Sequence, residues 1–494
     1  MSKQDQAIKP FALKIGLEVH VQLTCLKSKL FCGCSSDYRQ VPPNTFVCPV
    51  CLGIPGSLPV LNRKALEAAI SVALALDCKL SKRVLFWRKN YAYPDMSKNF
   101  QISQFDRAGG IPVATDGRVA ITVDRSRKDI RITRVHLEED PAKLVYPSTI
   151  DTSPYTLADY NRSGIALLEI VTAPELASPR EARVLLQSLR SILEYLEVSD
   201  GALEGAMRCD ANISIEGGSR VEIKNISSFK EVERALNFEL IRQRDLAKKG
   251  IVVKRETRHW DEKTRVTVSL REKEEEHDYR YFPEPDLMPV TIDDDWVEEI
   301  RSNMAELPDA RKGRLVREYG LPPDDAEVIS SDKHLADFFE EGAKLYGNPK
   351  VVSNWLIGDF LRYLHECDLE IPEVRMNPSN LAEMLRLIDE GTITGKMAKR
   401  VLAEMFSTGK SPGAIVREEG LVRLDDRRQL EKLIDEVLEQ NPKAVRDALK
   451  DDEAIHFLLG QLMNATRGMA DPELSNSILR ERIMKIRGGS LKES

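Results

Sequence analysis

The sequence contains 494 residues, of which 42% are hydrophobic and 31% are charged, and its formal net charge is −7. This length predicts about two to four domains, and the acidic balance argues against a dedicated nucleic-acid-binding protein, although a local basic groove stays compatible with it. No apolar run reaches the ~18 residues of a membrane-spanning helix, and residues 1–10 contain no apolar segment typical of a signal peptide. Eight cysteines without a secretion signal indicate a reducing compartment, so we expect a cytoplasmic protein without membrane contacts.

The first predicted element is a β-strand over residues 11–23. Apolar side chains occupy the odd positions from Leu13 to Leu23, whereas the even positions include Glu18 and His20. A period of two puts the apolar side chains on the core face and Glu18 and His20 together on the opposite face. Alone, such a pair is more often part of a polar sheet face than a metal site.

Two close pairs of cysteines follow the strand. They are Cys32 with Cys34 and Cys48 with Cys51, and a polar loop separates them. This arrangement is typical of a zinc site with four thiolates, although the single spacer residue in the first pair is shorter than usual. Four thiolates leave no coordination position open for water, so the pattern favours structural zinc. The alternative is four unrelated buried cysteines.

A buried helix is predicted over residues 65–76, and a segment that mixes cations with aromatic residues follows it. This segment contains Arg88, Lys89, Tyr91 and Tyr93. Such side chains can contact phosphates and stack on bases, although ordinary loops contain them as often. The similar segment 278–286 contains two prolines, which exclude a helix and indicate a rigid loop.

Carboxylates accumulate at three later positions of the chain. Segment 136–140 contains one histidine and three carboxylates, Glu169 lies within the apolar segment 166–171, and Asp210 lies on the polar face of a second predicted strand, residues 207–215. Each carboxylate taken singly is better explained by a salt bridge. Taken together, they would repel one another unless a cation lies among them, and oxygen-rich ligands suit Mg²⁺ bound to nucleotide phosphates. The candidate Mg²⁺ ligands are Glu18, His20, Glu138, Glu139, Glu169 and Asp210.

The helices of the chain are signalled by caps and by a change of periodicity. Ser178 and Ser228 each precede a glutamate by three residues and an amphipathic segment, which predicts two helices within the strand-rich part. After Pro289 all periodic segments are helical. We therefore expect an α+β protein with a mainly antiparallel β domain in residues 1–295, including the cysteine loop 32–51, an all-helical domain in 296–420 and a helical tail in 421–494.

Many of these segments, in the same order, resemble the GatB/GatE family of tRNA-dependent amidotransferase subunits. The resemblance covers essentially the whole chain, and residues 460–466 are similar to the YqeY-like tail module of that family. The segments that carry it are Ile15–Val21, Arg88–Tyr91, Tyr93–Asp95, Gln101–Asp106, His136–Asp140, Asp159–Arg162, Leu168–Val171, Arg208–Asn212, Glu222–Asn225 and Asp278–Asp286.

The resemblance implies a carbon–nitrogen ligase that uses glutamine as amido donor. In this family a cradle-shaped domain uses ATP to phosphorylate the side-chain carboxylate of Glu-tRNA(Gln) or Asp-tRNA(Asn). Ammonia released from glutamine by a GatA-type amidase subunit then displaces the phosphate. A small GatC-type subunit completes the heterotrimer, and the helical and tail domains bind tRNA. Expected cofactors are Mg²⁺ and a structural Zn²⁺, which part of the family contains, and ATP is a substrate.

The resemblance also suggests roles for individual residues. The six candidate ligands named above would bind Mg²⁺, and Arg88, Lys89 and Lys224 would contact phosphates. Tyr91 and Tyr93 would contact the acceptor end of tRNA.

Three other interpretations remain open. The first is a GatE-type archaeal subunit, which normally carries an extra inserted domain that the sequence does not indicate. The second is a non-catalytic zinc-containing tRNA-binding protein, which would have no reason to gather the acidic residues. The third is a metal-dependent nuclease, which would cleave tRNA instead of releasing ADP.

Overall fold

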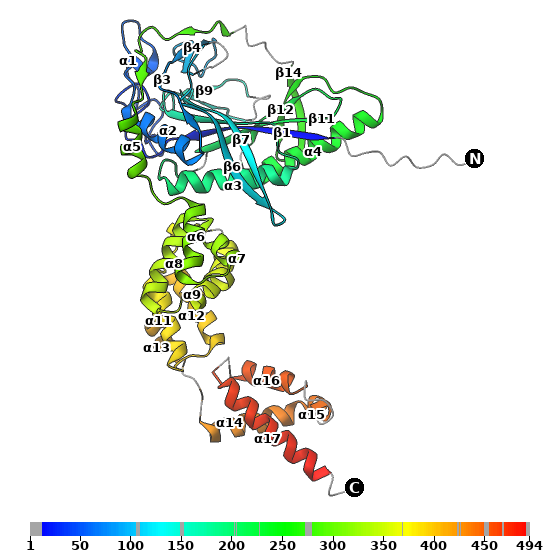
Figure 1. The fold of residues 1–494 in the computed structure, drawn as a ribbon. Coiled ribbons are helices and arrows are strands. Elements are labelled where there is room, and N and C mark those ends of the chain that lie inside the picture. The colour runs from blue at the N-terminus through cyan, green and yellow to red at the C-terminus, as the bar shows by residue number, and fades with distance from the viewer. Residues whose placement is uncertain are drawn as a thin grey trace, which may run out of the picture. The chain divides into compact units, whose positions relative to one another are not determined.

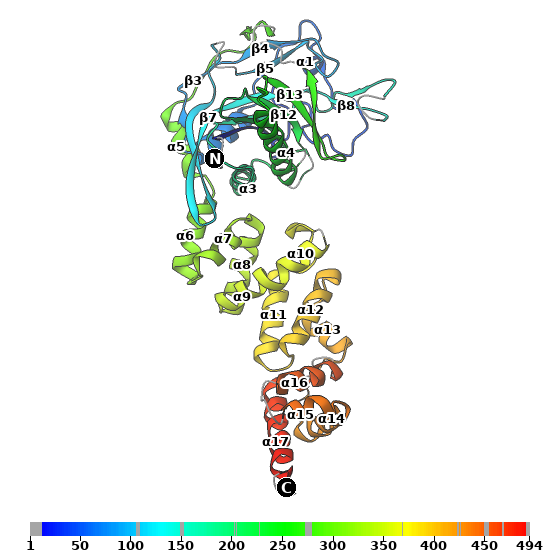
Figure 2. The ribbon, with the colours of Figure 1, turned by 90° about the vertical axis from the view of Figure 1, so that its right-hand side faces the viewer.

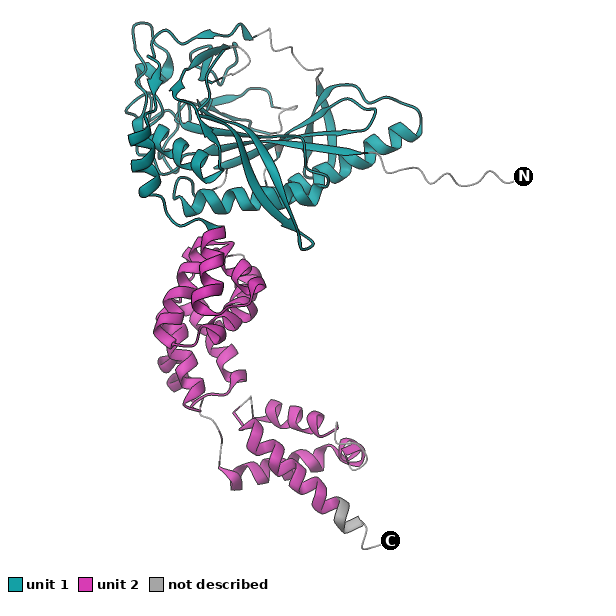
Figure 3. Cartoon of the chain, viewed as in Figure 1, with its two compact units in different colours: residues 1–308 teal, residues 309–494 magenta. Residues whose placement is uncertain are grey.

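The structure is a computed structural model with two compact units, residues 1–308 and residues 309–494 (Figure 3). Its secondary structure is α+β, which confirms the predicted fold class. No helix in the described part of the chain is long and apolar enough to cross a membrane. The described residues are 12–104, 109–148, 153–201, 203, 205–226, 228–271, 279–367, 369–421, 424, 426–448, 454–466 and 469–490.

A nine-stranded sheet forms the centre of the first unit, in the order β14-β13-β12-β11-β1-β10-β7-β6-β2. Neighbouring strands are antiparallel except β12 and β13, which are parallel. The strands are β1 (Leu13–Gln22), β2 (Lys79–Leu80), β6 (Ala114–Val123), β7 (Ser126–Glu139), β10 (Ala166–Thr172), β11 (Met207–Ile215), β12 (Val221–Ile226), β13 (Glu256–Asp261) and β14 (Val266–Arg271).

Two long helices cover one face of this sheet (Figure 1). They are α3 (Pro179–Tyr195) and α4 (Phe229–Lys248), and they begin after the predicted N-caps. The side chain of Ser178 accepts a hydrogen bond from the backbone N–H of Glu181, and Ser228 accepts one from Glu231. The apolar side chains of β1 point toward these helices and are buried, so burial of apolar surface fixes which face of the strand is polar.

A smaller sheet lies on the other side of β7 from α3 and α4 (Figure 2). It contains β15 (Phe282–Pro283), β4 (Trp87–Asn90) and β5 (Phe100–Ser103), in that order. Proline cannot donate to a strand ladder and is therefore confined largely to edge strands, which is where Pro283 lies. The predicted rigid loop thus contributes the edge of this small sheet.

The remaining elements of the first unit are short, apart from α2 (Arg63–Ala75), whose buried face packs into the main core as predicted. Helix α5 (Asp294–Ser302) also packs against this core, through Trp296, Val297 and Ile300. The unit therefore extends to Pro308, beyond the boundary near residue 295 expected from sequence. The other elements are α1 (Pro49–Leu52), β3 (Arg83–Val84), β8 (Lys143–Val145), β9 (Leu157–Asp159) and β16 (Val290–Thr291).

The described elements of the second unit are helical and enclose two separate hydrophobic cores. One core contains buried residues from Leu315 to Leu421, and the other contains buried residues from Leu430 to Ile483. The helices are α6 (Pro308–Tyr319), α7 (Pro323–Ser330), α8 (Lys333–Tyr346), α9 (Pro349–Trp355), η3 (Leu356–Phe360), α10 (Leu361–Cys367), η4 (Ile371–Glu373), α11 (Pro378–Asp389), α12 (Gly395–Thr408), α13 (Pro412–Glu418), α14 (Arg427–Gln440), α15 (Pro442–Ala448), α16 (Ala454–Ala465) and α17 (Pro472–Ser490).

Removing one side chain from the middle of the main core tests this packing. Ile170 of β10 is fully buried between Val19 of β1 and Val135 of β7. We expect Ile170→Ala to lower the free energy of unfolding of the first unit by about 2–5 kcal/mol, because it leaves a cavity in a packed core. Urea unfolding measures the change, and Val252→Ala, at a side chain that is 70% exposed, is the control. Equal losses in both variants would contradict the described core.

Candidate functional site

The polar face of the nine-stranded sheet brings several predicted ligands into adjacent positions. His20 of β1 lies opposite Glu169 of β10, which in turn lies opposite His136 of β7. Glu18 lies opposite Asp210 of β11. Directly paired residues of neighbouring strands point to the same face, so the core that orients β1 also orients these side chains.

Four of the six candidate Mg²⁺ ligands meet, with His20 at the centre of the other three. Its Nε2 atom lies 3.5 Å from Glu18 Oε1, 3.9 Å from Glu138 Oε1 and 3.9 Å from Glu169 Oε2. Glu18, His20 and Glu169 each offer one ligand atom, and these three atoms lie within 4.8 Å of one another. This spacing could hold a metal ion. We call Glu18, His20, Glu138 and Glu169 the acidic cluster.

The charges of the acidic cluster are only partly compensated by neighbouring cations. Burial raises the pKa of Glu169 to about 8, with further contributions from Glu18 and Glu138, while His20 and Arg134 oppose the shift. Burial also raises the pKa of Glu138, against the attraction of Lys89. Carboxylates held this close favour a bound cation that screens their repulsion, so the residues present fit a divalent metal.

The two other candidate ligands have cationic partners of their own. Glu139 pairs with Lys98 and accepts a hydrogen bond of 2.8 Å from the backbone N–H of Ile102, which joins β7 to β5. Asp210 lies 3.3 Å from Lys224 Nζ. Glu139 is therefore engaged elsewhere, whereas Asp210 borders the acidic cluster through its neighbour Glu18.

Of the predicted phosphate contacts, Lys224 lies nearest to these carboxylates. Burial opposes its charge, but Asp210, Glu222 and Glu18 together raise the pKa of Lys224. The ammonium is therefore charged at the border of the acidic cluster. Its position could offset the charge of an approaching phosphate.

Arg88 and Lys89 lie on β4, and the structure gives them different surroundings. Arg88 donates hydrogen bonds of 2.7 and 2.8 Å to Glu284 and one of 3.0 Å to Asp286, so its guanidinium fixes the segment after β15. Lys89 Nζ lies 4.9 Å from the ring centre of Tyr279 and attracts Glu138. Lys89 is thus the better placed of the two for a ligand at the acidic cluster.

Tyr91 and Tyr93 differ in exposure. Tyr91 is half-buried, its ring lies edge-on to Tyr279 at 6.1 Å, and burial and nearby carboxylates raise its pKa. The side chain of Tyr93 is 55% exposed. An exposed ring beside the small sheet is available to a ligand, so the predicted contact of Tyr93 with the acceptor end of tRNA stays a prediction.

Sequence patterns missed three polar partners of these residues. Lys98 pairs with Glu139, Ser103 Oγ donates to Glu138 Oε2 at 2.8 Å, and Arg134 Nη2 lies 3.4 Å from Glu169 Oε1. Arg134 precedes His136 by two residues, so strand alternation could have indicated it. Ser103 lies within the segment Gln101–Asp106 that carries the family resemblance, whereas nothing local in the sequence marks Lys98.

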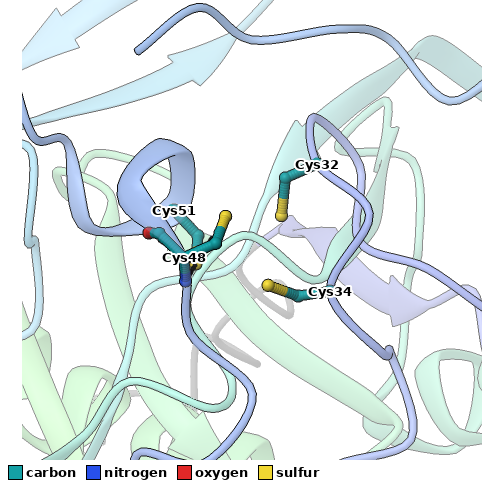
Figure 4. A group of neighbouring side chains, drawn as sticks. All are labelled: Cys32, Cys34, Cys48 and Cys51. Atoms are coloured by element: carbon teal, nitrogen blue, oxygen red, sulfur yellow. Dashed lines mark hydrogen bonds between the residues drawn. The ribbon is translucent and has the colours of Figure 1, made fainter. Parts of the chain in front are cut away.

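The four predicted zinc ligands converge at a second place in the first unit. Cys32 and Cys34 face Cys48 and Cys51, which lie at the start of α1 (Figure 4). Their four sulfur atoms lie within 4.8 Å of one another. The Sγ atoms of Cys48 and Cys51 are 3.8 Å apart, and a tetrahedron with zinc–sulfur bonds of about 2.3 Å has edges of about 3.8 Å.

The electrostatics of this four-cysteine group also fit a cation. A hydrogen bond from Cys32 lowers the pKa of Cys51 to about 4, and the nearby Lys29 contributes in the same direction against burial. Burial and the neighbouring thiols raise the pKa of Cys34 to about 11. The four thiols thus perturb one another strongly, and a metal ion would favour the thiolate form of all four.

The fold and its two sites define an α+β protein with a cluster of carboxylates on the polar face of its sheet, a four-cysteine loop and a helical C-terminal unit. Residues 13–298 match the family model described as the GatB/GatE catalytic domain, and residues 337–483 match that of the GatB domain. The chain belongs to the GatB/GatE family.

Curated relatives cover nearly the whole chain, and the three that follow are each named as the B subunit of aspartyl/glutamyl-tRNA(Asn/Gln) amidotransferase. The relative from Carboxydothermus hydrogenoformans is 50% identical over 487 residues, which are 97% of this chain and 100% of the relative. The relative from Sulfurisphaera tokodaii is 51% identical over 470 residues, with coverages of 95% and 99%. The relative from Thermotoga maritima is 49% identical over 476 residues, with coverages of 94% and 98%. The resemblance found in the sequence is confirmed.

Substitution of one cysteine tests the four-cysteine group. We expect the purified chain to contain about one zinc ion and Cys48→Ser to lose it, because tetrahedral zinc needs all four ligands. Elemental analysis measures the zinc content. Cys25→Ser, at an exposed cysteine outside the group, should retain the metal. Unchanged zinc in Cys48→Ser would refute the assignment.

The raised pKa of Glu169 predicts pH-dependent metal binding at the acidic cluster. Below about pH 8 this carboxyl holds a proton that a metal must displace, so the affinity for Mn²⁺ should increase with pH by up to about tenfold per unit until that pH is reached. Titration calorimetry on either side of neutrality measures this. Glu169→Gln has no such proton and should bind weakly with a flatter pH profile. A wild-type affinity independent of pH would contradict the buried, protonated carboxyl.

Proposed function

We propose that the chain is the B subunit of a tRNA-dependent amidotransferase that amidates the side-chain carboxylate of Glu-tRNA(Gln), Asp-tRNA(Asn) or both. The family match and the names of the relatives support the reaction. The meeting of Glu18, His20, Glu138 and Glu169 on one sheet face is the observation that carries the catalytic role.

The chemistry of the substrate explains why such a site is needed. A carboxylate is a poor acceptor for ammonia, and an acyl phosphate is a good one. One carboxylate oxygen attacks the γ-phosphorus of ATP, and the bond between that phosphorus and the oxygen of departing ADP breaks. Ammonia then attacks the acyl carbon, the bond between that carbon and the phosphate oxygen breaks with its electron pair going to the departing phosphate, and loss of one proton gives the amide. The first step brings two anions together, so it needs positive charge nearby.

The residues of the polar face divide this task. Glu18, His20, Glu138 and Glu169, with Asp210 at their border, would hold Mg²⁺, which when bound neutralises charge on the nucleotide phosphates. Lys224 and Lys89 add fixed positive charge on two sides of the acidic cluster. Glu139 and Lys98 hold β7 against β5, and Arg88 orients the segment after β15 through Glu284.

The proposal includes partners and a second metal. Glutamine would supply ammonia through a GatA-type amidase subunit, with a GatC-type subunit completing the heterotrimer. The term subunit in the names of the relatives supports an assembly. The four-cysteine group would bind structural Zn²⁺, since four thiolates fill its coordination.

The alternatives are less well supported. One relative aligns over its entire length with 97% of this chain, which disfavours the extra inserted domain of a GatE-type subunit. A non-catalytic RNA-binding protein gives no reason to hold several buried carboxylates around one histidine. A nuclease would use similar ligands, and the reaction products distinguish it.

The decisive experiment uses the chain co-purified with its amidase and small partner subunits. ADP release is measured with and without Glu-tRNA(Gln), in the wild type and in Glu169→Gln. We expect tRNA-dependent ADP release that Glu169→Gln reduces by about a hundredfold or more, because losing a metal ligand removes several kcal/mol of transition-state stabilisation. Glu216→Gln, at an exposed carboxylate on the first unit, should act like the wild type.

Three results would contradict the proposal. These are ADP release that does not depend on tRNA, equal rates in the wild type and Glu169→Gln, and cleavage of the tRNA in place of amidation.

A further inference from the structure

Lys29 is a buried cation without a carboxylate partner among the described residues. Its side chain is among the largest that are fully buried in the chain. The Nζ atom lies 2.8 Å from the carbonyl oxygen of Phe46, 3.3 Å from that of Tyr160 and 3.7 Å from Cys51 Sγ. Within the described ranges, no carboxylate oxygen lies within 4.0 Å of this ammonium.

Such a burial needs a nearby negative charge. An ammonium that leaves water loses a large solvation energy, and neutral carbonyl oxygens recover only part of it. Cys51 of the four-cysteine group offers that charge at 3.7 Å, whereas the carboxylate of Glu139, which also lies near Gly164, is paired with Lys98. Four thiolates around one Zn²⁺ carry a net charge of −2. The ammonium of Lys29 and this negative metal site would therefore each lower the free-energy cost of burying the other.

We propose that Lys29 is the counter-ion of the four-cysteine metal site, and that its charge, through the hydrogen bond to Cys51, slows the loss of zinc. This inference rests on the zinc site proposed above and is independent of the amidation chemistry. Lys29 is a positioning residue, because it acts through Cys51 and does not touch the metal.

The same side chain joins the metal site to the segment that leads into β10. Besides the contact of Lys29 with Tyr160, the backbone N–H of Leu30 donates to the carbonyl of Gly164 at 2.9 Å. Gly164 has a φ of +84°, and a Cβ atom there would lie 3.5 Å from Cys51 Cβ and 3.6 Å from Lys29 Cδ. Lys29 therefore fills the space between the cysteines and the chain just before the strand that carries Glu169.

A purely structural role for Lys29 makes a different prediction from a counter-ion. If the ammonium only cross-links two carbonyl oxygens, a neutral donor such as glutamine would preserve its effect on the metal. If its charge matters, both a neutral donor and an apolar side chain would weaken metal retention. Lys29→Gln and Lys29→Met thus separate the two roles, and Lys27→Met, at an exposed lysine two residues away, is the matched control.

The experiment measures zinc transfer from the full chain to an excess of a chromogenic chelator. We expect Lys29→Met and Lys29→Gln to release zinc about tenfold to a hundredfold faster than the wild type, as is typical when a partner of a metal ligand is lost. Lys27→Met should release zinc at the wild-type rate. In the cobalt-substituted proteins, the thiolate-to-metal charge-transfer band should shift in both Lys29 variants and stay unchanged in Lys27→Met.

Four outcomes would overturn the inference. They are unchanged zinc release in Lys29→Met, wild-type release in Lys29→Gln, an unshifted cobalt band in both variants, and a wild-type chain that binds no zinc. If Lys29→Met does not fold, Lys29→Gln decides the question alone, because its side chain is polar and of similar length. Release of ADP in the presence of tRNA can be measured whether or not the wild type contains zinc. Failure of this inference is therefore distinguishable from failure of the proposed reaction.

Discussion

Mutual repulsion among closely spaced carboxylates is the constraint on which the polar face of the sheet depends. Glu18, Glu138 and Glu169 surround His20. Their strands hold these side chains on one face because the apolar residues that alternate with them are buried in the core on the other face. The strands cannot slip by one residue to relieve the repulsion without exposing that core. Hydrophobic burial therefore supplies the free energy that holds these carboxyl groups together, and such a group of oxygen ligands favours a divalent cation.

The first unit contains two sites of opposite chemical character, and a short run of the chain links them. The carbonyl oxygen of Cys51 accepts a hydrogen bond of 2.7 Å from Ser97, and the next residue, Lys98, pairs with Glu139 at the end of β7. The sulfur atoms, which soft metals prefer, thus lie in a loop, whereas the oxygen atoms, which hard cations prefer, lie on the polar face of the sheet.

Local periodicity predicted elements well and contacts between them poorly. The alternation around Glu18 and His20 predicted the strand Leu13–Gln22 within one or two residues at each end, and the strand Met207–Ile215 matches its prediction. The family and the fold class predicted from the motifs are confirmed. The placement of β10 between β1 and β7, which brings Glu169 to His20, is a property of topology that no local pattern encodes. Partners distant in sequence, such as Glu284 for Arg88, were missed for the same reason.

The proline in β15 has a consequence for the solubility of the unit. An exposed edge strand offers unpaired N–H groups on which another chain can add a strand, and proteins suppress this with prolines and charges. Pro283 lacks the N–H, and so does Pro285 two residues later, so the small sheet cannot readily extend past this edge. The edge of the small sheet is thereby protected against aggregation through strand addition.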